Sequence, residues 1–287
     1  MKTKLYLALA ALALLFFGHS AQAAITCSIS SPGFFSLYDG LAATDNLNQS
    51  AYTINCTRLA GDPNTLNYIA FTNDGLYNIG ATNRALLSGS NYLKYDFYTD
   101  GTYGTNWSKS QRCIVGTVNF GGLTTGSQTK TYYSKVPAAQ TGLPQGTYSD
   151  TVTVYASYNQ TSCGASATQN TSGSFQIQIS NVPACQIAVP PGNVAFAYTS
   201  FSTSSVAAST TYQARCSTNL AYTMALDATS GTVIGLAYSL SLGVSTGTGN
   251  GALQSYTING TMAAGQVGIC AAGSCTSSDP RTLIITY

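Results

Sequence analysis

The sequence predicts an all-β protein that consists of two β-sandwich domains, the second of which lacks its last strand. Short runs of alternating apolar and polar residues recur between turn residues along the whole chain. One arrangement of tyrosine and cysteine occurs twice. After Ala23, no stretch keeps a helical period long enough to predict a helix. The 287 residues are enough for two separate cores.

The segment 1–23 is predicted to be an export signal. Lys2 and Lys4 form its basic start, residues 5–17 its apolar run, and Ala21-Gln-Ala23 its cleavage site. The apolar run is shorter than the roughly 20 residues that cross a bilayer, and no later stretch reaches that length. We therefore expect a mature protein that begins near Ala24, leaves the cytoplasm and has no membrane span.

The composition argues against several classes of function. Without Lys2 and Lys4, nine basic residues face nine Asp, there is no Glu, and the single histidine, His19, lies in the signal. Nucleic acids and anionic membranes need clustered cations, which this chain lacks. The missing histidine excludes Ser-His-Asp, Cys-His and histidine-based zinc sites in the mature chain. The Asp residues stand beside turn residues, so we expect no enzyme, no cofactor and no metal.

All eight cysteines follow the signal, and an even number in an exported protein predicts disulfides. Cys27 precedes Tyr52-Thr-Ile-Asn-Cys56, and Cys185 precedes Tyr212-Gln-Ala-Arg-Cys216, so the spacing between the two cysteines is nearly equal in the two segments. This repeat predicts two related domains, 24–181 and 183–287, which join near Asn181-Val-Pro183. The repeat, and elimination for the remaining cysteines, predict four pairs: Cys27–Cys56, Cys113–Cys163, Cys185–Cys216 and Cys270–Cys275.

The last strands differ between the two domains. In the first domain, residues 147–155 are followed by a second strand, 174–180, which places Phe175, Ile177 and Ile179 on one face. The second domain ends on a matching strand, 281–287, and nothing follows it. A half-buried strand without a partner exposes backbone N–H and C=O groups. We expect these sandwiches to be immunoglobulin-like and the second to be covered by another molecule, unless its topology differs and needs no further strand.

Several segments resemble the spore coat protein U domain family. In the first domain these are Cys27, Phe35-Ser-Leu-Tyr-Asp39, Arg84, Leu93-Lys-Tyr-Asp-Phe-Tyr98 before Trp107, and Leu143-Pro-Gln-Gly-Thr-Tyr148. In the second domain they are residues 256–262, residues 264–270 and the terminal Thr-Leu-Ile-Ile-Thr-Tyr. The similarity covers nearly all of the mature chain.

The resemblance implies a subunit of archaic chaperone–usher pili, which include the Csu type. Such pilins resemble immunoglobulin domains without their last strand. A periplasmic chaperone fills the gap at first, an outer-membrane usher assembles the fibre, and the amino-terminal donor strand of the next subunit replaces the chaperone. We expect the acceptor groove of the second domain to involve Leu283, Ile285, Tyr287, Ile187 and Val189.

The resemblance also implies a position in the fibre. A polymerising pilin needs a donor segment before its first cysteine, and here only Ala24-Ile-Thr26 precede Cys27. Three residues are too few for a strand. We therefore expect a tip subunit, exported through the periplasm to the cell surface, with a self-complete adhesin domain at 24–181 and a strand-accepting pilin domain at 183–287.

For the ligand, the resemblance implies attachment and biofilm formation on hydrophobic surfaces through apolar loops. The candidate loop residues all stand beside Gly, Asn, Asp or Pro: Leu41, Leu47, Leu76, Tyr77, Ile79 and Leu143. Each could equally be a core residue that flanks a turn. A second possibility is a tip lectin for a host glycan, with Trp107 as the best stacking candidate, although its surroundings favour a core role. A third is a coat or matrix protein that never polymerises.

Overall fold

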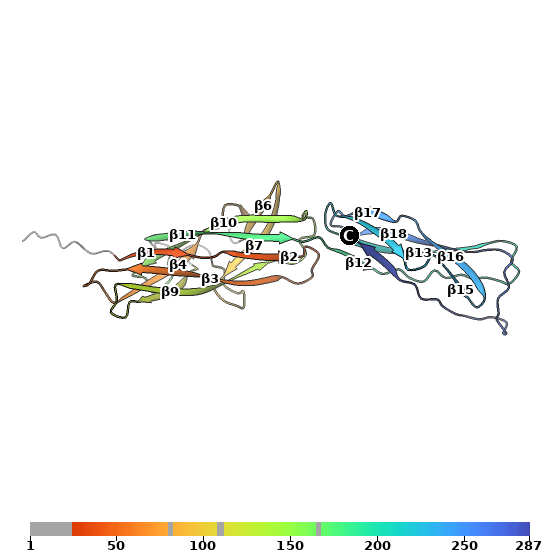
Figure 1. The fold of residues 1–287 in the computed structure, drawn as a ribbon, viewed down its shortest axis with the longest axis horizontal. Coiled ribbons are helices and arrows are strands. Elements are labelled where there is room, and N and C mark those ends of the chain that lie inside the picture. The colour runs from red at the N-terminus through yellow and green to blue at the C-terminus, as the bar shows by residue number, and fades with distance from the viewer. Residues whose placement is uncertain (1–24, 80–82, 108–111, 165–167) are drawn as a thin grey trace, which may run out of the picture.

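The computed structural model describes residues 25–79, 83–107, 112–164 and 168–287, and it contains strands but no helix among them. Two β-sandwiches lie end to end along the long axis, and the described C-terminus lies beside the boundary between them (Figure 1). We call residues 25–182 domain one and residues 184–287 domain two. The predicted export signal lies outside the described residues. Within them, no helix has the length and apolar character needed to cross a bilayer.

The described part of domain one contains eleven strands. They are β1 Thr26–Ser30, β2 Phe34–Tyr38, β3 Asn46–Thr57, β4 Thr65–Thr72, β5 Asn78–Ile79, β6 Asn83–Ser88, β7 Asn91–Tyr98, β8 Ile114–Asn119, β9 Thr125–Val136, β10 Gly146–Tyr158 and β11 Thr171–Asn181. Hydrogen bonds connect them in the order β1-β3-β9-β7-β6-β10-β11-β2, and β4 joins β10 to β8. Period-two burial along β10 and β11 places one face of each strand in the core.

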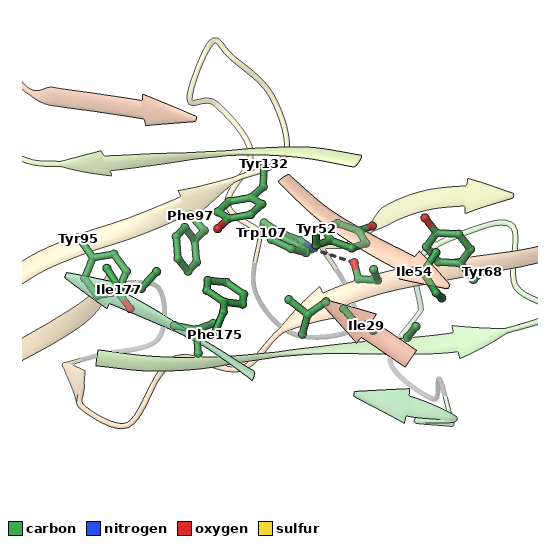
Figure 2. Packing of buried hydrophobic residues seen from close by; sticks show 14 of the residues in the cluster. Ile29, Tyr52, Ile54, Tyr68, Tyr95, Phe97, Trp107, Tyr132, Phe175 and Ile177 are labelled. Atoms are coloured by element: carbon green, nitrogen blue, oxygen red, sulfur yellow. Dashed lines mark hydrogen bonds between the residues drawn. The ribbon is translucent and has the colours of Figure 1, made fainter. Parts of the chain in front are cut away.

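The core of domain one is aromatic (Figure 2). Trp107 stacks on Tyr52 with ring centroids 5.3 Å apart, and Phe97 meets Tyr132 edge to face at the same distance. Phe175 of β11 packs against the Tyr132 ring at 5.6 Å. Such rings bury large apolar areas and dominate core energetics.

Strand β11 closes this core. It runs antiparallel to β10 from Gly146↔Asn181 to Ala156↔Thr171, and parallel to β2 from Ile177↔Phe34 to Asn181↔Tyr38. Its residues Phe175, Ile177 and Ile179 are buried, which confirms the face predicted from the sequence. Domain one is thus sealed by a strand that lies between two others.

Domain two contains two smaller sheets. Its strands are β12 Cys185–Val189, β13 Val206–Cys216, β14 Ala221–Leu226, β15 Ser230–Val233, β16 Leu236–Leu242, β17 Thr246–Thr248, β18 Gln254–Met262 and β19 Leu283–Thr286. One sheet has the order β12-β13-β18-β16-β15 and the other the order β17-β14-β19. Among the residues that the structure describes, the core cluster of domain two holds six buried residues, against 24 in domain one. Eight further apolar side chains pack against the cluster of domain two and are only partly buried.

The connection between the domains is short and hydrogen-bonded on both sides. The Val182 N–H donates to Tyr38 O at 2.9 Å, and the Ser217 N–H donates to Ala184 O at 2.9 Å. Only Pro183, which has no N–H, lies between them. We call this connection, together with the contacts around it, the joint.

The joint also contains loop contacts. Pro144 forms a β-bridge with Thr218, and Gly251 lies so close to the loop of domain one that an added Cβ would be 2.0 Å from Thr141 O. Gly251 has a φ of 76°, which favours glycine. The two domains therefore contact each other through loops as well as through the chain.

Four disulfides join Cys27–Cys56, Cys113–Cys163, Cys185–Cys216 and Cys270–Cys275, the pairs that the repeat and elimination predicted. The first and third lie at matching places, between the first two paired strands of each domain. This agreement makes it possible to compare the domains position by position.

Candidate functional site: an open strand edge in domain two

The candidate site is the outer edge of β19. This strand pairs antiparallel with β14, from Thr223↔Thr286 to Leu226↔Leu283. Within the described ranges, no residue pairs with its other edge. The strand of domain one that corresponds to β19 shows whether this edge is normally paired in such a sandwich.

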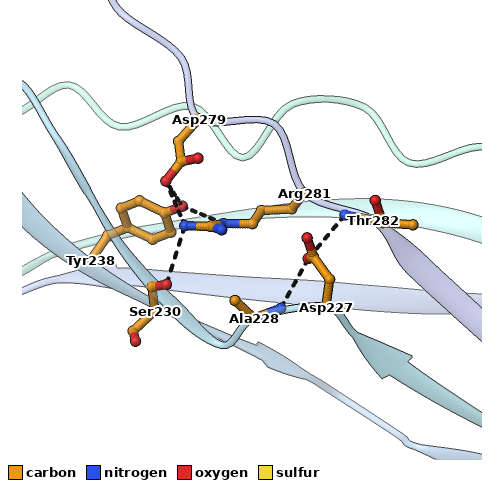
Figure 3. Close-up of polar contacts among 7 residues, drawn as sticks. All are labelled: Asp227, Ala228, Ser230, Tyr238, Asp279, Arg281 and Thr282. Carbon is orange, nitrogen blue, oxygen red and sulfur yellow. Dashed lines mark hydrogen bonds and ion pairs between the residues drawn. The ribbon is translucent and has the colours of Figure 1, made fainter.

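A tyrosine–aspartate hydrogen bond that occurs in both domains identifies the corresponding strand. In domain one, the Tyr95 hydroxyl of β7 donates to Asp150 Oδ2 of β10 at 2.7 Å. In domain two, the Tyr238 hydroxyl of β16 donates to Asp279 Oδ2 at 2.7 Å (Figure 3). Asp279 is four residues before Leu283, as Asp150 is before Val154. The match aligns the segment that leads into β19 with β10.

A second pair of contacts gives the same alignment. Asn73 Oδ1 accepts from the Thr153 N–H at 2.9 Å in domain one, and Asp227 Oδ1 accepts from the Thr282 N–H at 3.0 Å in domain two. Both contacts indicate that β19 corresponds to β10 and that β14 corresponds to β4. The sandwiches therefore share their architecture up to this strand.

A glycine beneath a tyrosine ring supports the match of β14 with β4. Gly116 is paired with Tyr68 in domain one, and Gly247 is paired with Tyr222 in domain two. A Cβ at either glycine would approach the tyrosine Cζ within about the same distance, 2.4 Å and 2.5 Å. The strand next to β14 thus also has a counterpart in domain one.

The alignment shows what domain two lacks. In domain one the outer edge of β10 carries β11, whereas β19 has no such neighbour among the described residues. Val154 and Ala156 of β10 are fully buried, but their counterparts Leu283 and Ile285 are only half-buried. Ile29 is 9% exposed, while its counterpart Ile187 on β12 is half-buried.

Residues 194–198 form the other side of the open site. They correspond to β2, because Tyr198 precedes Tyr212 by the same interval in the sequence that separates Tyr38 from Tyr52. Both Tyr38 and Tyr198 accept a backbone N–H through the hydroxyl, from Gln140 at 3.1 Å and Gln266 at 2.9 Å. The segment is not a strand in domain two, since the strand that pairs with β2 in domain one has no counterpart there.

The side chains that line the open site are apolar, and we call them the open row. Val194, Phe196 and Tyr198 alternate with exposed alanines and are half-buried, as are Leu283 and Ile285 across from them. Such a row of half-buried side chains beside unpaired backbone groups is the arrangement that an added strand would complete.

A charged cluster occupies the end of this row at Arg281, which stands where domain one has Val152 (Figure 3). Arg281 Nε donates to the Tyr238 hydroxyl at 2.8 Å, and Nη2 contacts Asp279 Oδ2 at 2.5 Å. The hydrogen bond to Tyr238 is the main cause that raises the pKa of Arg281, so the guanidinium stays charged. In the described part of the chain, no three His, Cys, Asp or Glu side chains are placed to hold a metal.

The predicted groove residues have different surroundings. Leu283, Ile285 and Ile187 line the open row and are half-buried. Tyr287 and Val189 are exposed, at 58% and 45%. The sequence did not single out Val194, Phe196 and Tyr198, although their spacing to Tyr212 contained the signal.

The predicted apolar loop residues do not form one exposed group. Leu41 is 8% exposed, so its prediction as an exposed loop residue is wrong: it lies in a turn that folds onto the sandwich. Leu143 is half-buried against the core, and Leu47 is exposed beside the joint end of β3.

The other three predicted loop residues lie beside the β6–β7 hairpin. Leu76 is exposed and donates its N–H to Asp150, and the ring of Tyr77 meets that of Tyr92 at 6.4 Å. Ile79 belongs to β5, and its side chain lies outside the described part of the structure. A role for these residues in binding stays a prediction.

Two exposed leucines at the opposite end of domain one were missed. Leu59 and Leu123 are each 66% exposed, and they lie in the turns β3–β4 and β8–β9, at the end farthest from domain two. Arg58 connects the two turns, since its Nε donates to Leu123 O at 2.8 Å and its Nη1 to Asp62 O at 2.6 Å. Each leucine stands alone among turn residues, so no pattern in the sequence brought the two together.

Trp107 is fully buried in the aromatic core, so the stacking role considered for it is wrong. Three tyrosines form another aromatic group on the outer side of β7 and β9. Tyr103 meets Tyr98 at 5.5 Å and Tyr133 at 6.0 Å. Tyr103 has a φ of 57°, unusual for a bulky residue. Asp100 holds its loop by accepting hydrogen bonds from the Thr102 hydroxyl and from three backbone N–H groups. The Thr102 bond and then the backbone bonds lower the pKa of Asp100 to about 2.

Solved structures match the chain at low sequence identity, and three of them are tip adhesins or fimbrial proteins. The CupB6 tip adhesin of Pseudomonas aeruginosa has 12% identity and a TM-score of 0.40, with 92% of this chain and 96% of that chain covered. A chaperone–tip adhesin complex of CFA/I fimbriae has 11% identity and a TM-score of 0.28, with 93% and 98% covered. AggA, the major subunit of aggregative adherence fimbriae type I of Escherichia coli, has 11% identity and a TM-score of 0.30, with 57% and 99% covered. At these TM-scores, the matches carry no argument about function.

No curated protein matches the sequence. A family model does match, over residues 13–155 and 171–247, which is more than half of the chain. This match confirms the family predicted from the sequence. It covers domain one apart from residues 156–170 and domain two up to residue 247, so the domain-two segments that suggested the family lie beyond it. The chain belongs to the Spore Coat Protein U domain family.

Proposed function

We propose that the protein is the tip adhesin of an archaic chaperone–usher pilus, in which domain one attaches the cell to a surface and domain two accepts a strand from the fibre. The observation that carries this proposal is the open edge of β19 beside a half-buried apolar row. Domain one provides the reference, because the same positions there are covered by β11. The family to which the chain belongs is consistent with this role.

The free energy gained when a strand fills the open site is large enough to decide whether domain two stays folded. A strand that buries about four apolar side chains gains roughly 6–12 kcal/mol, at about 1.5–3 kcal/mol for each. This is an upper estimate, because the free segments already bury part of their surface. The gain is still similar to the whole stability of a domain, about 5–15 kcal/mol.

The partners follow from this need. A periplasmic chaperone would supply the strand first, the usher would receive the complex, and the amino-terminal extension of the next subunit would then replace the chaperone. Strand β11 serves as the template for the final strand. On that template, the strand runs antiparallel to β19 and parallel to residues 194–198.

A sealed chain tests the acceptor role. Residues 159–181, which hold the loop and β11 of domain one, are appended after Tyr287 with Cys163→Ser in the appended copy. We expect a soluble monomer in which the β19 amides exchange hydrogen far more slowly than in the natural chain, because an intramolecular strand then pairs with them. The matched control carries Phe175→Ser, Ile177→Ser and Ile179→Ser in the appended copy only.

The outcomes separate clearly. Slow exchange in the sealed chain and fast exchange in the serine control support strand acceptance. Equal exchange of β19 in the natural and sealed chains would refute it. Co-purification of the natural protein with a periplasmic chaperone, lost when Leu283→Asp and Ile285→Asp are combined, tests the same edge in the cell.

For attachment, we propose the end of domain one that is farthest from domain two. Leu59 and Leu123 are exposed there on turns that Arg58 connects, and its guanidinium lies 5.4 Å from the Phe120 ring. Two leucines give weak binding to an apolar surface, at about 1.5–3 kcal/mol for each, and many pili on one cell multiply it. We expect Leu59→Ser with Leu123→Ser to reduce cell adhesion to polystyrene. The matched control, Leu76→Ser with Leu47→Ser, tests the loops predicted from the sequence.

The tyrosine group favours glycan binding as a second candidate. Tyr103 and Tyr133 are half-exposed, and Tyr103 is held in a strained conformation over the outer face of the sheet. A glycan array with the natural protein and with Tyr103→Ala tests it. Specific binding lost in the variant, with adhesion to plastic unchanged, would favour the lectin over the apolar tip.

A further inference from the structure

The end of domain two that is farthest from domain one exposes three large apolar side chains. Phe201 is 70% exposed, Val267 54% and Ile269 78%. We call these three residues the end patch. They come from two segments, the connection after residues 194–198 and the connection between β18 and β19. Exposed apolar side chains that gather from separate segments mark interaction surfaces.

The backbone holds the end patch in place. The Phe201 N–H donates to Gln266 O, and the Ile269 N–H donates to Ile234 O, both at 2.9 Å. Phe201 and Ile234 have φ angles of 64° and 50°, a region that bulky and β-branched residues rarely adopt. Strain of this kind persists only where surrounding contacts fix the backbone, so the patch is a built feature of the fold.

Two glutamines with the same hydrogen bonds identify the corresponding end of domain one. Gln140 exchanges side-chain bonds with the backbone of Lys94, and Gln266 exchanges the same bonds with the backbone of Ala237. Both glutamines also donate to the carbonyl three residues earlier, at Pro137 and Ala263. Gln140 and Gln266 are therefore equivalent positions.

The alignment from the glutamines matches the end patch to the joint. Val267 corresponds to Thr141 and Ile269 to Leu143. Counted from the equivalent tyrosines at 38 and 198, Phe201 corresponds to Leu41. Thr141 lies in the loop that touches Gly251 of domain two. The end patch is thus the counterpart of the surface of domain one against which domain two packs.

The chain path gives the partner. In domain one the sealing strand β11 ends at Asn181 and leads through Val182 and Pro183 into β12. The strand that seals domain one is therefore directly followed by domain two, which packs at the joint. Strand β11 places Phe175, Ile177 and Ile179 in the core at ten, eight and six residues before Cys185. The joint is therefore an intramolecular example of a strand donor packing on its acceptor.

We propose that the end patch is the docking surface for the body of the subunit whose strand fills domain two. The partner is a β-sandwich that resembles domain two, with apolar residues about ten, eight and six positions before its first cysteine and a glycine-containing loop against Val267 and Gly268. This inference rests on the proposed function. It adds that the partner binds twice, through its strand and through its body, as domain two does to domain one.

The test uses three versions of the full chain. The first is the natural chain, the second is the sealed chain that carries residues 159–181 after Tyr287, and the third carries residues 159–287 after Tyr287. In each appended copy Cys163→Ser prevents a free thiol. In the third chain, the appended copy also carries Phe201→Ser, Val267→Ser, Ile269→Ser and Ile284→Val, so that its peptides differ in mass from those of the first copy.

The readouts are hydrogen exchange at β19 and hydroxyl-radical labelling of Phe201 and Ile269 in the first copy. We expect β19 to be protected in both extended chains. Labelling of the end patch should fall several-fold only in the third chain, where a body follows the strand. Labelling of Val244, which is 51% exposed and outside the patch, serves as the internal control.

Each outcome decides one point. Protected β19 with unchanged labelling of the patch overturns the docking surface and leaves strand acceptance intact. Unprotected β19 in both extended chains overturns the proposed function. A fourth chain, with Phe201→Ser, Val267→Ser and Ile269→Ser in the first copy as well, should keep β19 protected while small-angle scattering shows independent movement of the appended module. If that module stays as rigidly placed as in the third chain, the patch does not dock it.

Discussion

Domain one and domain two are built on the same plan, but among the described residues only domain one has the strand that completes it. Tyr95–Asp150 and Tyr238–Asp279 make the same hydrogen bond at the same length in the two sandwiches. The strands around these pairs match in order and register. The difference is β11, which covers β10 in domain one and has no counterpart on β19 among the described residues.

One strand decides how much of each sandwich is core. Where β11 is present, both of its neighbours are regular strands and their inward side chains are buried. Where it is absent, residues 194–198 are irregular and Leu283 and Ile285 stay half-buried. The missing strand thus affects two segments that are distant in sequence, because it would have paired with both.

The largest effect is expected when a core side chain of β11 in domain one is truncated. Phe175→Ala removes a buried ring from the aromatic core and should reduce the free energy of unfolding by about 3–5 kcal/mol. Chemical denaturation followed by Trp107 fluorescence measures it, since the single tryptophan lies in domain one. Gln176→Ala, on the solvent face of the same strand, should change stability by no more than about 0.5 kcal/mol. Equal effects of the two substitutions would contradict a sealing role for β11.

The second effect compares the two aspartates. Asp150 is buried and accepts bonds from Tyr95, Leu76 and Thr151, so Asp150→Ala should cost about 2–3 kcal/mol through the lost charged hydrogen bonds. Asp279→Ala removes the corresponding bond at a partly exposed site and should cost clearly less. Native-state hydrogen exchange of β10 and β18 measures the two losses. A larger loss for Asp279→Ala would mean that domain two is not the more open sandwich.

The third effect concerns the matched glycines. Gly116→Ala would place a Cβ against the Tyr68 ring in a closed core, with an expected cost of about 1–3 kcal/mol. Gly247→Ala meets Tyr222 in the same way, but half-buried neighbours such as Ile285 leave room for the ring to shift. We expect a smaller loss in the natural chain and a loss closer to that of Gly116→Ala in the sealed chain. If Gly247→Ala lowers the free energy of unfolding equally in the natural and the sealed chain, the Tyr222 ring does not gain room from the half-buried neighbours.

The smallest effect at neutral pH concerns the equivalent tyrosines 52 and 212. Burial raises the pKa of Tyr52 well above its ordinary value and raises that of Tyr212 as well. The unfolded chain releases these protons near pH 10, before the folded chain does, so both domains should lose stability as the pH rises above about 10. Tyr52→Phe should flatten this loss in domain one. Denaturation at pH 8 and at pH 11 measures it, and a loss that is equally steep in the variant would exclude Tyr52 as its source.

The sequence predicted the repeat and its disulfides because cysteine and tyrosine spacing is the same in both domains where other residues differ. Tyr52-x-x-x-Cys56 and Tyr212-x-x-x-Cys216 sufficed to align the first halves of the domains. The alternation in residues 174–180 gave the buried face of β11 correctly. Such local patterns are visible because strand periodicity repeats every two residues.

The site beyond β19 was only partly predictable. Residues 194–198 alternate as a strand should, but their role depends on a partner strand that the pattern does not contain. Leu41 and Phe201 occupy equivalent positions, yet one is buried and the other is 70% exposed. No property of either residue reveals this, because burial there depends on what packs against that end of the sandwich.

The path from β11 into β12 has a mechanical consequence. A pull on domain two reaches domain one through Val182 at the end of β11, along the axis of that strand. The eleven residue pairs between β10 and β11 are then loaded in shear and must slip together, whereas a perpendicular pull would open them one after another. The direction in which the sealing strand leaves its sandwich therefore makes the protein suited to carrying tension along its long axis.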